Sequence, residues 1–211
     1  MHWLRRDVAA QCERAGEVIV VSEANSFPLI LGGGRAWNAA ARVAAGETGA
    51  VADLLAGLAI VAETGFQLGG PAMFVVLGEA YVAAGQLDEA RGAVETGLAV
   101  AAQTGQLFWD AELHRLQGEC LLAQEVKSQN EKGKNQNLTE AEECFHRALD
   151  IARAQRAKSM ELRAATSLAR LWRDQGKRVA ARDLLAPLYG WFTEGFDTRD
   201  LVDAKALLAE L

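Results

Sequence analysis

The sequence predicts an all-α protein built as an α-solenoid, a stack of antiparallel helix pairs that ends in a capping helix. Apolar residues recur at helical spacing along almost the whole chain. The breaks between these periodic segments are short and centred on glycines, and short connections place consecutive helices antiparallel. The composition also favours helices, because alanine and leucine dominate and the 211 residues include only three prolines.

The breaks divide the chain into about ten helices, with bounds good to about 2–4 residues. The predicted helices span residues 3–24, 28–45, 49–64, 71–84, 87–104, 107–124, 138–155, 158–175, 178–193 and 198–210. No segment alternates with a period of two for long enough to predict a strand. The β-branched run from Val18 to Val21 is the best strand candidate, but it lies inside a longer helical pattern.

The helix pairs share a pattern of small and large residues at the period of the tetratricopeptide repeat, about 34 residues. In one copy, Gly78 and Ala90 are the small residues that let two helices approach, and Tyr81 fills the space beside them. A later copy places Ala169 and Ala181 at the same separation. The sequence therefore predicts a tetratricopeptide-like solenoid.

A third copy, which contains Gly118 and Phe145, is split by the insert QEVKSQNEKGKNQN. The insert is polar and lacks apolar periodicity, so we expect a mobile loop over residues 125–137. We predict a single repeat domain over residues 1–211. Its repeats are expected at residues 28–64, 71–104, 107–155 and 158–193, followed by a cap at 198–211.

Composition narrows the classes of partner and the compartment. A formal charge of −6 gives no electrostatic footprint for nucleic acid or for an anionic membrane. Cys12, Cys120 and Cys144 are scattered without a CxxC pair, so we expect neither a disulfide framework nor a zinc site. The first residues carry charge where a signal peptide needs an apolar stretch, so we expect a cytoplasmic protein.

Specific motifs appear toward the C-terminal end, where GWFTEGFDT is followed by an AKALL helix and preceded by FWDAELHRLQGECLLA. These motifs closely resemble the C-terminal region of large bacterial signalling ATPases of the AAA or STAND type. The resemblance covers most of the chain from about Phe66 onward and spans Ala157 to Leu211 most closely. Such proteins carry a cyclase-like or DNA-binding domain at the front, an NTPase module in the middle and tetratricopeptide repeats at the back.

The resemblance implies a regulatory repeat region, and the residues needed for catalysis are missing. The nearest glycine cluster, LGGGRAWN at Leu31 to Asn38, lacks the spacing and the Lys-Ser/Thr ending of a phosphate-binding P-loop. The paired aspartates of a cyclase are also missing. We therefore expect no enzyme activity and no cofactor. The alternative is a fragment that carries the ATPase or adenylate cyclase annotation of its parent family while lacking that activity itself.

The spacing of the cysteines and histidines predicts neither a metal site nor a reactive cysteine. Cys144 and His146 are two residues apart on a helix and point to different faces, and His114 and Cys120 are placed little better. We interpret the cysteines as small buried hydrophobic residues. Trp109, Trp172 and Trp191 could form a stacking platform, but helical spacing favours packing in the core or between repeats.

Charged residues on the first helix of each pair are the best candidates for contact with a ligand, since these helices line the concave face of such arrays. The alternative is a solvated charged face, or ion pairs within one helix. The predicted contacts are Glu79, Glu112, Arg115, Glu119, Arg163, Arg170 and Arg173. The three last arginines would form a basic strip for carboxylates or phosphates. The expected partner is a protein or peptide segment, an NTPase domain of the same longer protein, or a small effector.

Overall fold

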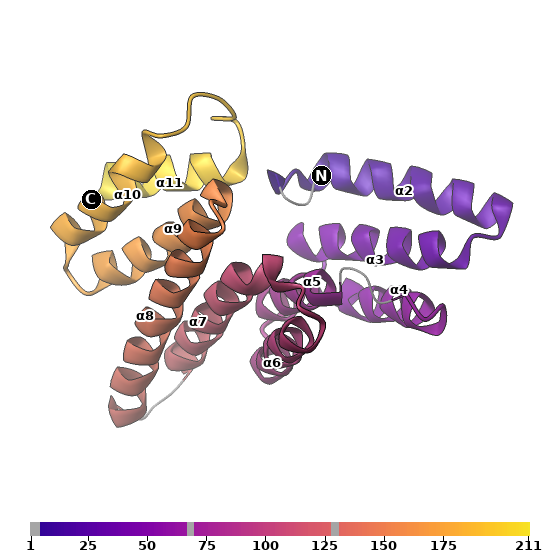
Figure 1. Cartoon of the computed structure of the whole chain (residues 1–211), viewed down its shortest axis with the longest axis horizontal. Coiled ribbons are helices and arrows are strands. Elements are labelled where there is room, and N and C mark those ends of the chain that lie inside the picture. The colour runs from indigo at the N-terminus through magenta and orange to yellow at the C-terminus, as the bar shows by residue number, and fades with distance from the viewer. Residues whose placement is uncertain (1–4, 67–69, 128–130) are drawn as a thin grey trace. The chain divides into compact units, whose positions relative to one another are not determined.

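The structure, a computed structural model, describes residues 5–66, 70–127 and 131–211 (Figure 1). Every regular element in these ranges is a helix, which confirms the all-α prediction. Among them, no helix is long and apolar enough to cross a membrane. Contacts between Cα atoms divide the chain into two compact units, Met1–Val100 and Ala101–Leu211. The prediction of a single domain over the whole chain stays a prediction.

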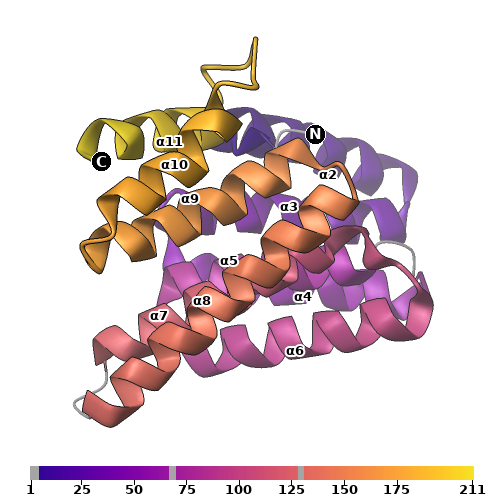
Figure 2. The same ribbon diagram turned by 60° about the vertical axis from the view of Figure 1, so that its left-hand side comes forward.

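The first unit consists of antiparallel helices joined by short turns. Its elements are α2 (Val8–Asn25), α3 (Pro28–Ala44), a 3-10 turn η1 (Thr48–Ala50), α4 (Val51–Glu63), α5 (Gly70–Ala84) and most of α6 (Leu87–Thr104). Consecutive helices α2, α3 and α4 lie side by side (Figures 1 and 2). The β-branched run Val18 to Val21 lies within α2, so this strand candidate is helical.

Helices α3 and α4 approach unusually closely because glycines face each other across the contact. A Cβ atom added to Gly57 on α4 would lie 2.6 Å from the backbone nitrogen of Ala36 and 2.9 Å from the carbonyl oxygen of Gly32. Neither position can hold a side chain unless the helix backbones move apart. The absence of two Cβ atoms thus sets the distance between these helices.

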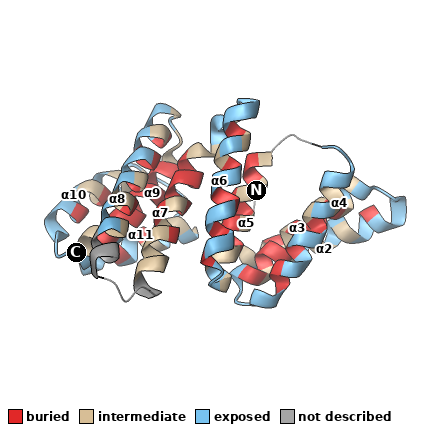
Figure 3. Cartoon of the chain, turned by 90° about the horizontal axis from the view of Figure 1, so that it is seen from below, coloured by how far each residue is buried: buried red, intermediate tan, exposed pale blue. Residues whose placement is uncertain are grey.

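The second unit is also built of helices, which range from 12 residues in α10 and α11 to 24 residues in α8. Its elements are a 3-10 turn η2 (Leu107–Trp109), α7 (Asp110–Lys127), α8 (Glu131–Ala154), α9 (Lys158–Asp174), α10 (Arg178–Tyr189) and α11 (Arg199–Glu210). Helix α9 is the central element, because it contacts α7, α8, α10 and α11. All residues from 160 to 169 are buried, so α9 is covered on every side over this stretch (Figure 3).

The loop predicted for residues 125–137 differs from the structure. Helix α7 continues to Lys127 and α8 begins at Glu131, while residues 128–130 lie outside the described part of the chain. A segment without apolar periodicity can still extend a helix that is already nucleated, because each added residue then gains one backbone hydrogen bond. Such an extension needs no apolar stripe where it does not pack against a neighbour. The missing periodicity therefore did not exclude a helix over residues 131–137.

Candidate functional site

Three of the predicted contact residues lie on α7 and form a largely buried ion-pair network. Arg115 donates from Nε and Nη2 to Oε1 of Glu112 over 2.9 and 2.7 Å, and from Nη1 to Oε1 of Glu119 over 3.1 Å. The side chain of Glu112 is fully buried and that of Arg115 is 8 % exposed. Ser167 on α9 also donates its hydroxyl to Glu119 over 2.5 Å. This network ties α7 to α9, and its buried members are not available to a ligand.

The three predicted arginines do share one face of α9, but α11 supplies an acidic partner for each of them. Arg163 Nε donates to Asp200 Oδ2 over 2.7 Å. Nη2 of Arg170 lies 3.8 Å from Oδ2 of Asp203, and Arg173 pairs with Glu210. Asp203 is also paired with Arg199 over 2.8 Å, so it is shared between two arginines. The capping helix thus places a carboxylate beside each arginine of the expected basic strip.

The remaining predicted contact, Glu79 on α5, belongs to the first unit. It accepts a hydrogen bond from Arg6 Nη2 over 3.1 Å, and its side chain is 21 % exposed. The structure therefore brings Glu112, Arg115, Glu119 and Arg163 together by direct contact. A ligand-contacting role for the predicted set stays a prediction.

Cys12 and Cys144, two of the three cysteines in the described part of the chain, are only partly buried. No group of three His, Cys, Asp or Glu side chains that could hold a metal ion occurs among the described residues. Burial, together with the carboxylates of Glu140 and Glu143, raises the pKa of the Cys144 thiol. A raised pKa disfavours the thiolate, which is the reactive form of cysteine. Cys120 is buried, as the sequence predicted for a small core residue.

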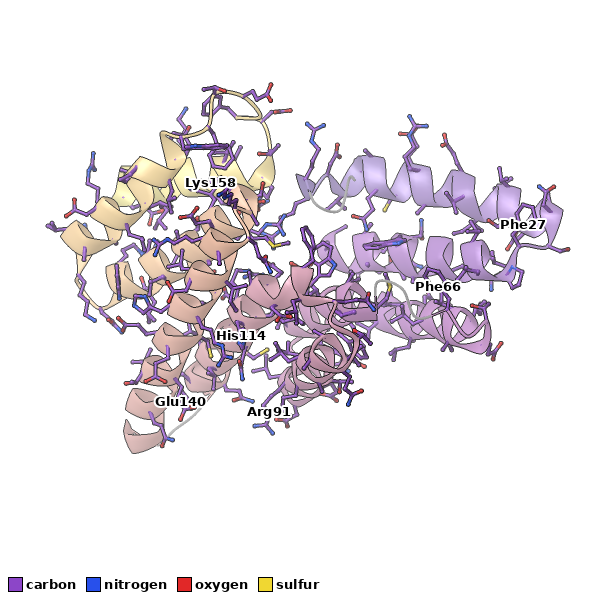
Figure 4. The ribbon with its side chains drawn as sticks, viewed as in Figure 1. Phe27, Phe66, Arg91, His114, Glu140 and Lys158 are labelled. Carbon is purple, nitrogen blue, oxygen red and sulfur yellow. The ribbon has the colours of Figure 1, made fainter. Side chains whose placement is uncertain are left out.

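A pocket on the second unit lies where the α8–α9 turn meets the segment that follows α10. Its volume is about 410 Å³, and its lining residues are Arg153, Arg156, Lys158, Glu161 and Trp191. Three of these five side chains are cations. Figure 4 labels Lys158 at the start of α9, and its ammonium lies 5.7 Å from the centre of the Trp191 ring. Sequence reasoning did not single out the basic residues of this pocket.

Glu161 holds two of the pocket's cations in place. Its Oε1 accepts from Arg153 Nε over 3.1 Å, and its Oε2 accepts from Lys158 Nζ over 2.6 Å. The Glu161 side chain is only 5 % exposed, whereas those of Arg153 and Lys158 are 49 % and 34 % exposed. A buried carboxylate therefore fixes two cations whose outer sides reach solvent.

Trp191 differs from the core position expected for it. The prediction placed it on a helix by its spacing from Leu188, but α10 ends at Tyr189. Beyond that end the helical spacing no longer applies, and Trp191 is 58 % exposed. Trp109 and Trp172, by contrast, pack against the hydrophobic core as predicted.

Arg156 occupies a turn position that usually favours glycine. Its φ is +56°, in the left-handed region, whereas the turns after α6 and α9 place Gly105 and Gly176 there with φ of +69° and +78°. In this backbone conformation, a residue with a side chain is less stable than glycine by about 1 kcal/mol. The Arg156 side chain is exposed, and no carboxylate of the described residues pairs with it.

The architecture is similar to solved structures of tetratricopeptide-like repeats. A crystal structure of the nearly identical TPR-like repeats of a kinesin light chain from Podosopora anserina superposes with a TM-score of 0.52 and 22 % identity, covering 99 % of this chain and 93 % of that chain. A variant of those repeats gives a TM-score of 0.54 and 23 % identity, covering 90 % and 91 %. No protein-family model matches the chain, and no curated protein matches it. At this identity the likeness shows the fold alone, and it confirms that the chain is a tetratricopeptide-like α-solenoid.

Proposed function

We propose that this chain is a non-catalytic helical-repeat module for protein–protein interaction or effector sensing. The observation that carries the proposal is the exposed Trp191 beside Arg153 and Arg156. Tryptophan and arginine dominate the energetically important positions of protein interfaces, because they combine a large apolar surface with directional hydrogen bonds. The predicted charged residues on α7 and α9 already pair with one another or with acidic residues of α11, so the pocket is the better binding surface.

Two further observations support a module without catalysis. The described residues hold no metal-ligating cluster, and burial disfavours the thiolate of Cys144. The sequence also lacks a P-loop. We therefore expect purified protein to hydrolyse neither ATP nor GTP and to make no cyclic nucleotide. Turnover that persists through successive purification steps at constant specific activity would contradict the proposal.

We also propose, from the resemblance of the C-terminal motifs, that this module is the C-terminal regulatory part of a bacterial signalling ATPase or cyclase-type protein. The partner is then a protein or peptide segment, an NTPase domain of the same longer protein, or a small effector. The alternative is a fragment that carries its parent's ATPase or cyclase annotation without the activity. The net charge of −6 disfavours nucleic acid and anionic membranes as partners.

The test compares what the immobilised chain and two of its variants retain from cell extract. Trp191→Ala removes the exposed ring of the pocket, and Val179→Ala removes an apolar side chain that is 75 % exposed on α10. We expect a partner that binds the parent and Val179→Ala but not Trp191→Ala. Each such partner is then purified, and its affinity is measured by isothermal titration calorimetry. Equal affinity of all three proteins for every purified partner would reject this surface.

A further inference from the structure

We infer that the pocket formed by Arg153, Arg156, Lys158, Glu161 and Trp191 binds a phosphate monoester in its dianionic form. This inference rests on the proposed function, because it names the chemistry recognised by the same surface.

The charges of the pocket match a dianion. Three cations and one carboxylate line it, so its formal charge is positive by two, although the chain as a whole carries −6. A phosphate monoester carries nearly two negative charges at neutral pH. A carboxylate carries one, and it would leave part of the positive charge uncompensated. Guanidinium groups also match the geometry of phosphate oxygens with paired N–H donors.

The cations are ordered before any ligand arrives. Arg153 uses Nε for Glu161, while its Nη1 faces only Asp150 at 3.8 Å, whose side chain is 79 % exposed. Lys158 uses one N–H for Glu161 and keeps two others. The buried Glu161 therefore holds the Arg153 guanidinium and the Lys158 ammonium at the rim of the pocket. Their remaining N–H donors are directed away from Glu161. Such order lowers the entropy lost on binding.

The backbone at Arg156 is a second, independent observation. Gly105 and Gly176 occupy the left-handed position in two other turns, where glycine adopts it without strain, whereas Ser26 after α2 and Arg156 here adopt it with a side chain. The arginine at this position has no carboxylate partner among the described residues. Costly backbone conformations that persist without a structural partner often occur at binding sites. We therefore assign the Arg156 side chain to the ligand.

Trp191 provides a flat apolar surface for the organic part of the ester. The ring is 58 % exposed, so it can cover one side of a ligand but cannot enclose it. The helix N-terminus of α9, which has no side-chain cap, adds further positive potential beside it. A half-open pocket of this kind suits a free phosphate ester or a phosphorylated side chain of a protein equally well.

The experiment titrates the full chain with phenyl phosphate, phenyl sulfate and benzoate at low ionic strength, using NMR of the tryptophan indole N–H groups and calorimetry. Phenyl phosphate is expected to bind at least tenfold more tightly than the two monoanions. A phosphotyrosine peptide and its unphosphorylated form make up a second arm. Tighter binding of the phosphopeptide than of phenyl phosphate assigns the ligand to a phosphorylated protein, and equal binding assigns it to a free ester.

Arg156→Gly is the decisive variant, because it removes the cation and also relieves the backbone. Binding of phenyl phosphate should weaken about tenfold or more, while the urea midpoint of unfolding stays the same or rises. Arg182→Gln removes the same charge from an exposed position on α10 and should leave binding unchanged. Equal affinity for benzoate and phenyl phosphate, or full affinity of Arg156→Gly, would overturn the inference. A Trp191-dependent protein partner that lacks phosphate would do so as well, yet it would preserve the proposed function.

Discussion

Nε of Arg163 on α9 donates a hydrogen bond across 2.7 Å to Oδ2 of Asp200 on α11. The two side chains are 5 % and 11 % exposed. Nη1 of Arg163 also lies 3.7 Å from Oε1 of the buried Glu112. This contact therefore attaches the capping helix to the charged network of α7 and α9.

Asp200→Asn should lower the free energy of unfolding by about 1–3 kcal/mol, because Arg163 loses a charged partner in a buried place. Asp203→Asn is the control, since its partners Arg170 and Arg199 are 44 % and 66 % exposed. We expect the control to change stability by no more than about 0.5–1 kcal/mol. Urea titration followed by circular dichroism measures both. Equal losses of unfolding free energy in the two variants would show that burial does not make the Arg163–Asp200 pair more stabilising than an exposed pair.

Gly57→Ala should destabilise the first unit, whereas Gly33→Ala should stabilise it slightly. At Gly57 the new Cβ would meet the backbone of α3 at 2.6 Å, so the two helices must separate. That overpacking costs about 1–3 kcal/mol. At Gly33, also inside a helix, nothing lies within 4 Å, and alanine gains up to about 1 kcal/mol of helix propensity. Thermal unfolding compares the variants, and similar midpoints would mean that α3 and α4 do not approach as closely.

Gly118→Ala should destabilise the second unit, and Phe145→Leu should partly rescue it. A Cβ atom at Gly118 would lie 2.5 Å from Cε1 of Phe145, whose side chain is fully buried and cannot turn away. We expect a loss of about 1–3 kcal/mol for the single variant. The double variant should lose less than the sum of the two singles, because the smaller side chain vacates the space. Strict additivity in urea titration would contradict this contact.

Stability should fall as pH is lowered from about 7.5 to 5.5, owing in part to His114. Burial lowers the pKa of His114 below its usual 6.5 in the folded state. The unfolded chain therefore takes up a proton at a higher pH than the folded chain, and protonation favours unfolding below about pH 6.5. Burial raises the pKa of Asp110, which acts with the opposite sign at more acidic pH.

His114→Gln should show a smaller loss of stability than the parent over this pH range. His146→Gln is the control, since the His146 side chain is 52 % exposed on α8. Urea midpoints at several pH values give the comparison. If the pH dependence of the urea midpoint were unchanged in His114→Gln but altered in His146→Gln, the loss of stability would be due to His146 and not to His114. The expected difference is a shallower fall of the urea midpoint with decreasing pH in His114→Gln, because the variant has no imidazole to protonate on unfolding.

The sequence determined the helices, because helix formation depends on neighbours within a few residues. Apolar spacing, glycine turns and the small residues at Gly78 and Ala90 were enough to predict the repeat class. The sequence assigned Gly118 and Phe145 to the same repeat, but only the structure showed that they lie against each other. The local sequence patterns gave a wrong structure at two places. The described parts of the polar insert are helical, residues 124–127 in α7 and residues 131–137 in α8, and helical spacing did not reach Trp191 because α10 ended first.

Only the tertiary structure decided which charges meet. The sequence predicted that Arg163, Arg170 and Arg173 share one helix face, but it gave no reason to place acidic residues of α11 against them. Likewise, the buried Glu161 orders Arg153 and Lys158, which come from different helices. Position on a helix face is set by a period of 3.6 residues, whereas the partner across a contact is set by how helices pack. The sequence therefore determined the module, and the packing decided which of its charges remain available to bind.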